Sequence, residues 1–198
     1  MATDRSAACI RAVRANLSTA VHVFDRFQVI KLFNDKLSAF RRTLSNQAST
    51  EGERQILKGT RWLLLKNPEN LDADRDELQR LEEALRLNQP LAAAYHLKED
   101  LRQIWEQPNK RTARRGLRDW LARARASGSR MLIQFADTRE QHQEGVLNYY
   151  HYRISTGPLE GTNNKIQLMK RQAYGFRDRD FFKRKILGLH ETKHALVG

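Results

Sequence analysis

The stretch VHVFDRFQVIKL, residues 21–32, sets the fold class because the hydrophobic period changes within it. The β-branched and aromatic run from Val21 to Phe24 predicts a buried strand over 20–25 that ends at Asp25. Beyond it, apolar residues recur at steps of three and four, which predicts a helix over 27–44 with an apolar face of Ile30, Phe33, Leu37, Phe40 and Leu44. An acid at the carboxyl end of a strand lies where open α/β sheets bind ligands.

The rest of the chain predicts helices almost throughout. Four prolines and ten glycines in 198 residues give few breaks. An acidic helix is predicted over 73–87, with Leu78, Leu81 and Leu85 on its apolar face. A basic helix is predicted from Pro108 to the joint at 127–129, and one long helix over 132–152. We therefore expect a mainly α protein with few strands.

A second informative stretch is STGPLEGTNNKIQLMKRQAYGFRD, residues 155–178. Pro158 suits the first turn of a helix, and Gly175 suits its end because glycine permits a left-handed turn. The helix separates an apolar stripe from a polar row; the row contains Glu160, Asn164, Gln167 and Arg171. A lone carboxylate among amides and bases suits a metal ion that faces a phosphate. Alternatively, Glu160 is a first-turn acid that complements the helix dipole, and the bases are solvated.

Together the two stretches resemble insertion-sequence transposases with an RNase-H-like DDE core, in the branch marked by D-R-F-H-V and E-G-x-N-N-K-I blocks. This chain carries DRFQV at 25–29, EGTNNKI at 160–166 and KRQAYGF at 170–176. The resemblance covers nearly the whole chain, including a similar middle region from Trp62 to Leu101. It implies a carboxy-terminal portion of such a transposase.

The resemblance also implies a domain arrangement within a mainly α chain. Residues 1–47 are expected to form a partial RNase-H-like α/β segment that contains the second catalytic strand. Residues 48–130 are expected to form an all-helical insertion. Residues 131–198 are expected to form the carboxy-terminal helical part of the catalytic domain.

The implied activity is metal-dependent DNA cleavage and strand transfer, with Asp25 and Glu160 as catalytic residues and ligands of Mg²⁺ or Mn²⁺. Two departures from the family pattern matter. Gln28 replaces a histidine, so that a titratable ring becomes a neutral amide. In the family, the first catalytic aspartate lies on a strand well upstream of the D-R-F-H-V block; only 24 residues precede Asp25 here, so this strand is expected to be absent, and Asp4 is not assigned to its role. We therefore expect weak metal binding and little or no strand cleavage by this chain alone.

The charge of the chain predicts a polyanionic partner. Lys and Arg number 36 against 23 Asp and Glu, for a net charge of +13. Charge alone does not choose among DNA, RNA and membrane lipid. The sequence has no run of about 18 apolar residues and no apolar signal segment, which predicts no membrane partner and a location in the bacterial cytosol or nucleoid. The single cysteine, Cys9, excludes an intramolecular disulfide.

Two basic clusters are candidate DNA contacts. The helix after Pro108 contributes Arg114 and Arg118, which suit the phosphate backbone; a solvated helix face is the alternative. The cluster around Glu160 contributes residues that would steer the scissile phosphate. These are Lys165, Lys170, Arg171 and Arg177.

A rival interpretation is a non-catalytic DNA-binding or assembly module derived from a transposase. Such a module contacts element ends or inhibits oligomers of the full-length protein. The expected partners are therefore DNA, at element ends and target, and another copy of this chain or a full-length transposase. A helical RNA-binding protein is disfavoured because no RNA-binding module signature is present.

Overall fold

The computed structural model describes residues 2–3, 15–17, 19–154 and 157–189. Asp4 and Cys9 lie outside these residues. The chain divides into two compact units, Met1–Ile154 and Ser155–Gly198. Each unit is built mostly from helices, which confirms the expected mainly α class.

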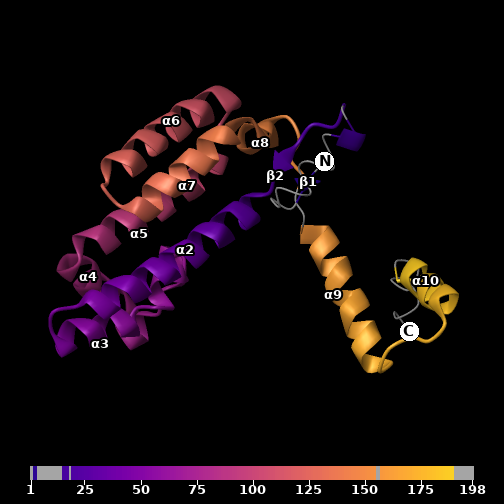
Figure 1. The fold of residues 1–198 in the computed structure, drawn as a ribbon, viewed down its shortest axis with the longest axis horizontal. Coiled ribbons are helices and arrows are strands. Elements are labelled where there is room, and N and C mark those ends of the chain that lie inside the picture. Colours follow the sequence, from indigo (N-terminus) through magenta and orange to yellow (C-terminus); the bar gives the residue numbers. More distant parts are fainter. Residues whose placement is uncertain (1, 4–14, 18, 155–156, 190–198) are drawn as a thin grey trace. The chain divides into compact units, whose positions relative to one another are not determined.

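The first unit contains one short parallel strand pair and a set of helices (Figure 1). Strand β1 (Ala2–Thr3) pairs with β2 (Val23–Phe24), which is shorter than the strand predicted over 20–25. The helices are α2 (Arg26–Gln47), α3 (Glu51–Gly59), α4 (Glu77–Leu87), α5 (Gln89–Gln103), α6 (Lys110–Ala126), α7 (Arg130–Gln141) and α8 (Gln143–Leu147). Short 3-10 turns are η1 (Leu63–Leu65), η2 (Pro68–Asn70), η3 (Ala73–Arg75), η4 (Ile104–Glu106) and η5 (Asn148–Tyr150).

The core of this unit lies along α2, which contacts α3, α5 and α7, while α6 packs on α5 and α7. Phe33 of α2 meets Trp120 and Phe135 edge to face, at centroid distances of 6.2 and 4.9 Å. The predicted apolar face of α2 is confirmed: Phe33 and Leu37 are fully buried, and its remaining members are partly buried against the same core. The Trp120 indole N–H donates to the Leu97 carbonyl at 2.7 Å, so the large ring is buried without an unsatisfied donor.

Two predicted helices differ from the observed ones. The acidic helix begins at Glu77 rather than at residue 73, because Asp76 is left-handed with φ of 51° and the Glu77 carboxylate turns back to accept from the Asp72 N–H at 2.9 Å. Leu78 is consequently exposed, whereas Leu81 is buried. The helix predicted over 132–152 is also wrong. It breaks at His142, whose φ of −121° is not helical, and continues as α8 and η5.

The second unit consists of α9 (Gly157–Gln172) and α10 (Arg179–Leu187). The end of α9 is as predicted: Gly175 is left-handed with φ of 98°, and its N–H donates to the Lys170 carbonyl at 3.0 Å. Phe176 stacks on Phe182 with their ring centroids 4.8 Å apart. Among the side chains described for this unit none is fully buried. Its polar row therefore faces solvent.

The start of α6 offers a direct test of the fold. The Asn109 side-chain oxygen accepts from the Thr112 N–H at 3.0 Å and caps the helix. Replacing Asn109 with alanine is expected to lower the free energy of unfolding by about 1 kcal/mol, measured by urea denaturation. The control is Asn70→Ala at an exposed position, which is expected to change stability by less than about 0.5 kcal/mol. Equal effects of the two substitutions would contradict the capping role.

Candidate active site and DNA-contacting residues

Asp25 sits at the junction between β2 and α2. It follows the last residue of the strand and caps the helix, because its Oδ1 accepts from the Phe27 N–H at 2.7 Å. The residue is only 2% exposed. The backbone therefore fixes the orientation of this carboxylate, and Gln28 follows in the first turn of the same helix.

The strand that leads to Asp25 rests on α8 and η5. A Cβ built at Gly145 would lie 2.5 Å from Cε2 of Phe24, so the phenyl ring occupies the place of a side chain there. The Asn148 amide donates to the His22 carbonyl at 3.0 Å, one residue before β2. Phe24 also meets the His142 ring edge to face at 5.7 Å. Residues from far along the chain thus hold the strand and, with it, Asp25.

The sequence alone does not indicate that Gly145 and Asn148 hold the strand before Asp25. A glycine between Glu144 and Val146 matches no motif, and only the proximity of Phe24 gives it a role. The segment was predicted to continue one long helix. The break at His142, which this prediction lacked, is what turns α8 toward β2.

Glu160 lies in the first turn of α9 and is exposed. Asp25 and Glu160 belong to different compact units, and their convergence on one metal ion stays a prediction. Both supply the hard oxygen atoms that Mg²⁺ and Mn²⁺ prefer, so the donor chemistry fits such an ion. Within the described part of the chain, no three His, Cys, Asp or Glu side chains are grouped as metal ligands.

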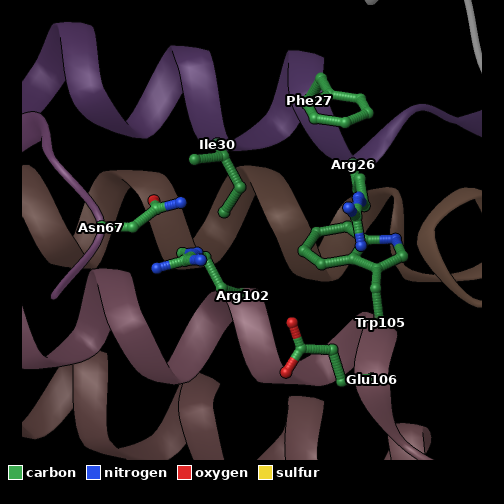
Figure 2. Close-up of a pocket in the computed structure, with 7 residues that line it drawn as sticks. All are labelled: Arg26, Phe27, Ile30, Asn67, Arg102, Trp105 and Glu106. Atoms are coloured by element: carbon green, nitrogen blue, oxygen red, sulfur yellow. The ribbon is translucent and has the colours of Figure 1, made fainter. Parts of the chain in front are cut away.

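A small pocket of about 140 Å³ adjoins the first turn of α2. In Figure 2, Arg26 and Trp105 lie at one end of it, and Asn67 and Arg102 at the other. Arg102 is held by Glu99 and Glu69, at 2.6 and 3.2 Å. The Arg26 guanidinium instead lies over the Phe27 ring, with its carbon 4.9 Å from the centroid. Space of this size admits several water molecules or a small polar group, but not a duplex.

Comparison with known proteins identifies the family. The sequence profile of a family described as "Transposase", the ISL3 type of DDE transposase, matches residues 1–186. This chain belongs to that transposase family. The match covers both β2 with Asp25 and α9 with Glu160.

This chain is similar to curated relatives over part of their length. It is 35% identical over 188 residues to the transposase for insertion sequence element IS1001 of Bordetella parapertussis, which is 94% of this chain and 46% of that protein. It is 31% identical over 121 residues to the transposase for insertion sequence element IS1557 of Mycobacterium tuberculosis, 61% of this chain and 27% of that protein. The chain thus spans less than half of either relative. No solved structure matches it.

The structure describes each of the predicted DNA-contacting residues. Arg114 donates to Glu144 at 2.8 Å, whereas Arg118 is exposed and has no ion pair among the residues described. The candidates of the second unit are likewise exposed and make no ion pair within the described part of the chain; they are Lys165, Lys170, Arg171 and Arg177. No helix of the described residues is long and apolar enough to cross a membrane.

Proposed function

We propose that this chain supplies part of the site at which a transposase cleaves and joins DNA strands, with Asp25 and Glu160 as ligands of Mg²⁺ or Mn²⁺. The observation that carries the proposal is the placement of Asp25: a buried acid directly after β2, within a family match that spans both acids. A bound divalent ion supplies an activated oxygen nucleophile and relief of charge at the leaving oxygen.

The two acids have different roles in holding the ion. Asp25 is oriented by the N–H of Phe27 and contributes a fixed oxygen ligand. Glu160 is exposed near the amino end of α9, where the helix dipole also favours anions such as a DNA phosphate. Mg²⁺ is usually held by one or two carboxylates together with substrate phosphates. The two acids alone therefore bind metal weakly, and DNA strengthens the binding.

The remaining predictions about the site belong to the same proposal. Lys165, Lys170, Arg171 and Arg177 orient the phosphate near Glu160. Arg118 contacts DNA from α6, whereas the predicted contact Arg114 is held by Glu144. The partners are the element ends and target DNA, and another copy of this chain or a full-length transposase. The segments 1–47, 48–130 and 131–198 remain the proposed functional division into partial catalytic segment, insertion and carboxy-terminal part.

Metal binding tests the proposal. Free Mn²⁺ is measured by electron paramagnetic resonance during titration of the full chain, with and without duplex DNA. Weak binding that tightens with DNA is expected. The Asp25→Asn and Glu160→Gln variants are each expected to bind at least about tenfold more weakly, because even outer-shell partners of a metal contribute about 10–100-fold in affinity. Asparagine also caps helices, so Asp25→Asn preserves the start of α2.

The matched control is Glu106→Gln, which removes an exposed acid that has no ion pair in the described residues. It is expected to bind Mn²⁺ like the unmodified chain. Unchanged Mn²⁺ affinity in Glu160→Gln would show that this acid is only a first-turn residue. With supercoiled plasmid and Mg²⁺, we expect no robust cleavage by this chain alone; strong cleavage abolished by Glu160→Ala would contradict that expectation.

The rival function, a DNA-binding module without metal chemistry, is favoured by one observation. Arg111, Arg115 and Arg118 of α6 are exposed and have no ion pair among the described residues, which suits phosphate binding whether or not a metal ion is held. DNA binding that is unaffected by Mn²⁺, together with no Mn²⁺ binding by the chain, would favour this rival.

A further inference from the structure

The basic residues of α6 fall into two sets. One set is held by acids of neighbouring helices: Arg125 pairs with Asp137 and Glu140 at 2.8 and 2.5 Å, and Arg123 pairs with Asp100 at 2.6 Å. Lys110 and Arg114 share Glu144, at 3.4 and 2.8 Å. The other set is Arg111, Arg115 and Arg118, each exposed and without an ion pair in the described part of the chain.

The second set forms a stripe on one side of the helix. Steps of four and then three residues return to nearly the same direction at about 100° per residue, and seven residues rise about 10 Å. One strand of DNA presents a phosphate for about every 3.4 Å of duplex axis. A stripe of about 10 Å therefore spans about three phosphate spacings of one strand, enough for each of the three arginines to reach a phosphate of its own.

We propose that Arg111, Arg115 and Arg118 form a contact surface for the phosphate backbone of duplex DNA. This rests on the proposed function, since that function supplies DNA as the partner. It differs from the sequence prediction, which named Arg114, because the guanidinium of Arg114 is already engaged by Glu144.

The other basic residues of α6 fix the stripe in place. Arg125 ties the helix to α7 and Arg123 ties it to α5, while Glu144 ties it to α8. The backbone of α6 is therefore fixed before DNA binds, and the conformational entropy lost on contact is that of the three arginine side chains.

The stripe is also linked to the strand that leads to Asp25. The Lys110 ammonium donates to Asn148 Oδ1 at 3.3 Å, and the Asn148 amide donates to the His22 carbonyl at 3.0 Å. These contacts all lie within the first compact unit. A DNA phosphate backbone bound on the stripe would accordingly lie in a fixed position relative to β2 and Asp25.

A membrane surface fits this face poorly. An interfacial helix presents exposed aromatic and aliphatic residues beside its bases. The large apolar residues of α6 are instead all buried in the core: Leu117, Trp120 and Leu121. Sequence-independent contact with phosphates requires only such an array of unpaired cations.

The test compares two variants of equal net charge. In the stripe variant, Arg111, Arg115 and Arg118 are all replaced with glutamine. In the matched control, Arg42, Lys58 and Arg86 are replaced with glutamine; these residues lie on α2, α3 and α4, are exposed, and have no ion pair among the described residues. Binding of the full chain to a labelled duplex is followed by fluorescence anisotropy at several salt concentrations, and circular dichroism checks the fold.

The stripe variant is expected to lose affinity at least about tenfold at physiological salt, and its slope of log affinity against log salt is expected to be shallower by about 2.7, or 0.9 for each of three phosphates. The control should keep the slope of the unmodified chain. Equal slopes for the two variants, or an unchanged slope in the stripe variant, would overturn the inference while leaving DNA binding itself intact.

Failure of the proposed function looks different, because the unmodified chain would then bind no Mn²⁺ with or without duplex DNA, whatever the salt slopes of the two variants. An acidic polypeptide is the alternative ligand that an exposed row of arginines could bind in place of DNA. Tighter binding of poly-L-glutamate than of DNA, lost in the stripe variant, would overturn the assignment to DNA.

Discussion

Replacing Gly145 with valine is expected to lower the free energy of unfolding by about 3 kcal/mol, the upper range for overpacking a filled core. A Cβ at this position would lie 2.5 Å from the Phe24 ring, and Phe24 is only 3% exposed. Because the ring is buried, it makes room only by displacing the residues packed around it or the strand that carries it. Because Asp25 follows Phe24 directly, the candidate ligand moves with the strand.

The matched pair Gly145→Ala and Gly116→Ala separates this clash from the general effect of glycine in helices. A Cβ at Gly116 of α6 meets no atom within 4 Å. Gly116→Ala should therefore stabilise by about 0.5–1 kcal/mol, from helix propensity alone. Gly145→Ala gains the same propensity but must displace Phe24, and a net loss of about 1–2 kcal/mol is expected in urea denaturation.

Whether each alanine substitution raises or lowers the free energy of unfolding shows whether the Gly145 segment holds β2. If Gly145→Ala stabilises as much as Gly116→Ala, the segment around Gly145 does not hold β2. Reduced Mn²⁺ affinity in Gly145→Ala, under conditions where the protein is still folded, would show that the segment also positions Asp25.

Removing the amine of Lys98 is expected to cost about 3 kcal/mol of stability, because the carbonyls of Leu64 and Lys66 then lose their hydrogen-bond donor inside the protein. Lys98 is 1% exposed. Its ammonium donates to the carbonyls of Leu64 and Lys66 at 2.6 and 3.2 Å and pairs with Glu99 at 2.7 Å. It therefore fastens the η1 turn to α5.

Lys98→Met is the informative substitution because methionine keeps most of the volume and removes the donors. Lys58→Met, at an exposed site in the last turn of α3, is the control and should change the free energy of unfolding by less than about 0.5 kcal/mol. Similar losses in the two variants would show that the buried amine contributes nothing specific.

The pH dependence provides an independent check on Lys98. Burial lowers its pKa from the ordinary value of 10.5, although Glu99 acts in the opposite direction. Between the folded pKa and 10.5, Lys98 binds more protons in the unfolded chain than in the folded chain. The contribution of Lys98 to the free energy of unfolding therefore rises with pH. The stability difference between the unmodified chain and Lys98→Met should therefore grow from neutral pH toward 10.5. A difference that is constant over this range would contradict the burial of the charge.

Local pattern was sufficient for much of the helical fold. The period of α2 gave its apolar face, and Pro158 and Gly175 marked the two ends of α9, because these features depend on neighbouring residues. The failures came where distant contacts override propensity. The acidic helix starts late because Glu77 bonds to Asp72 and Lys66, and the long helix after residue 132 breaks where α8 turns to meet β2.

For the candidate site, too, some features follow from the sequence and others only from the tertiary structure. The sequence by itself determined the family blocks, the two acids and the excess of basic residues, since these are properties of residue type and spacing. Only the tertiary structure decided which cations are available and what holds Asp25 in place. Ion pairs such as Arg114 with Glu144, and the contact of Gly145 with Phe24, join residues 30 and 121 positions apart, and no local period encodes such contacts.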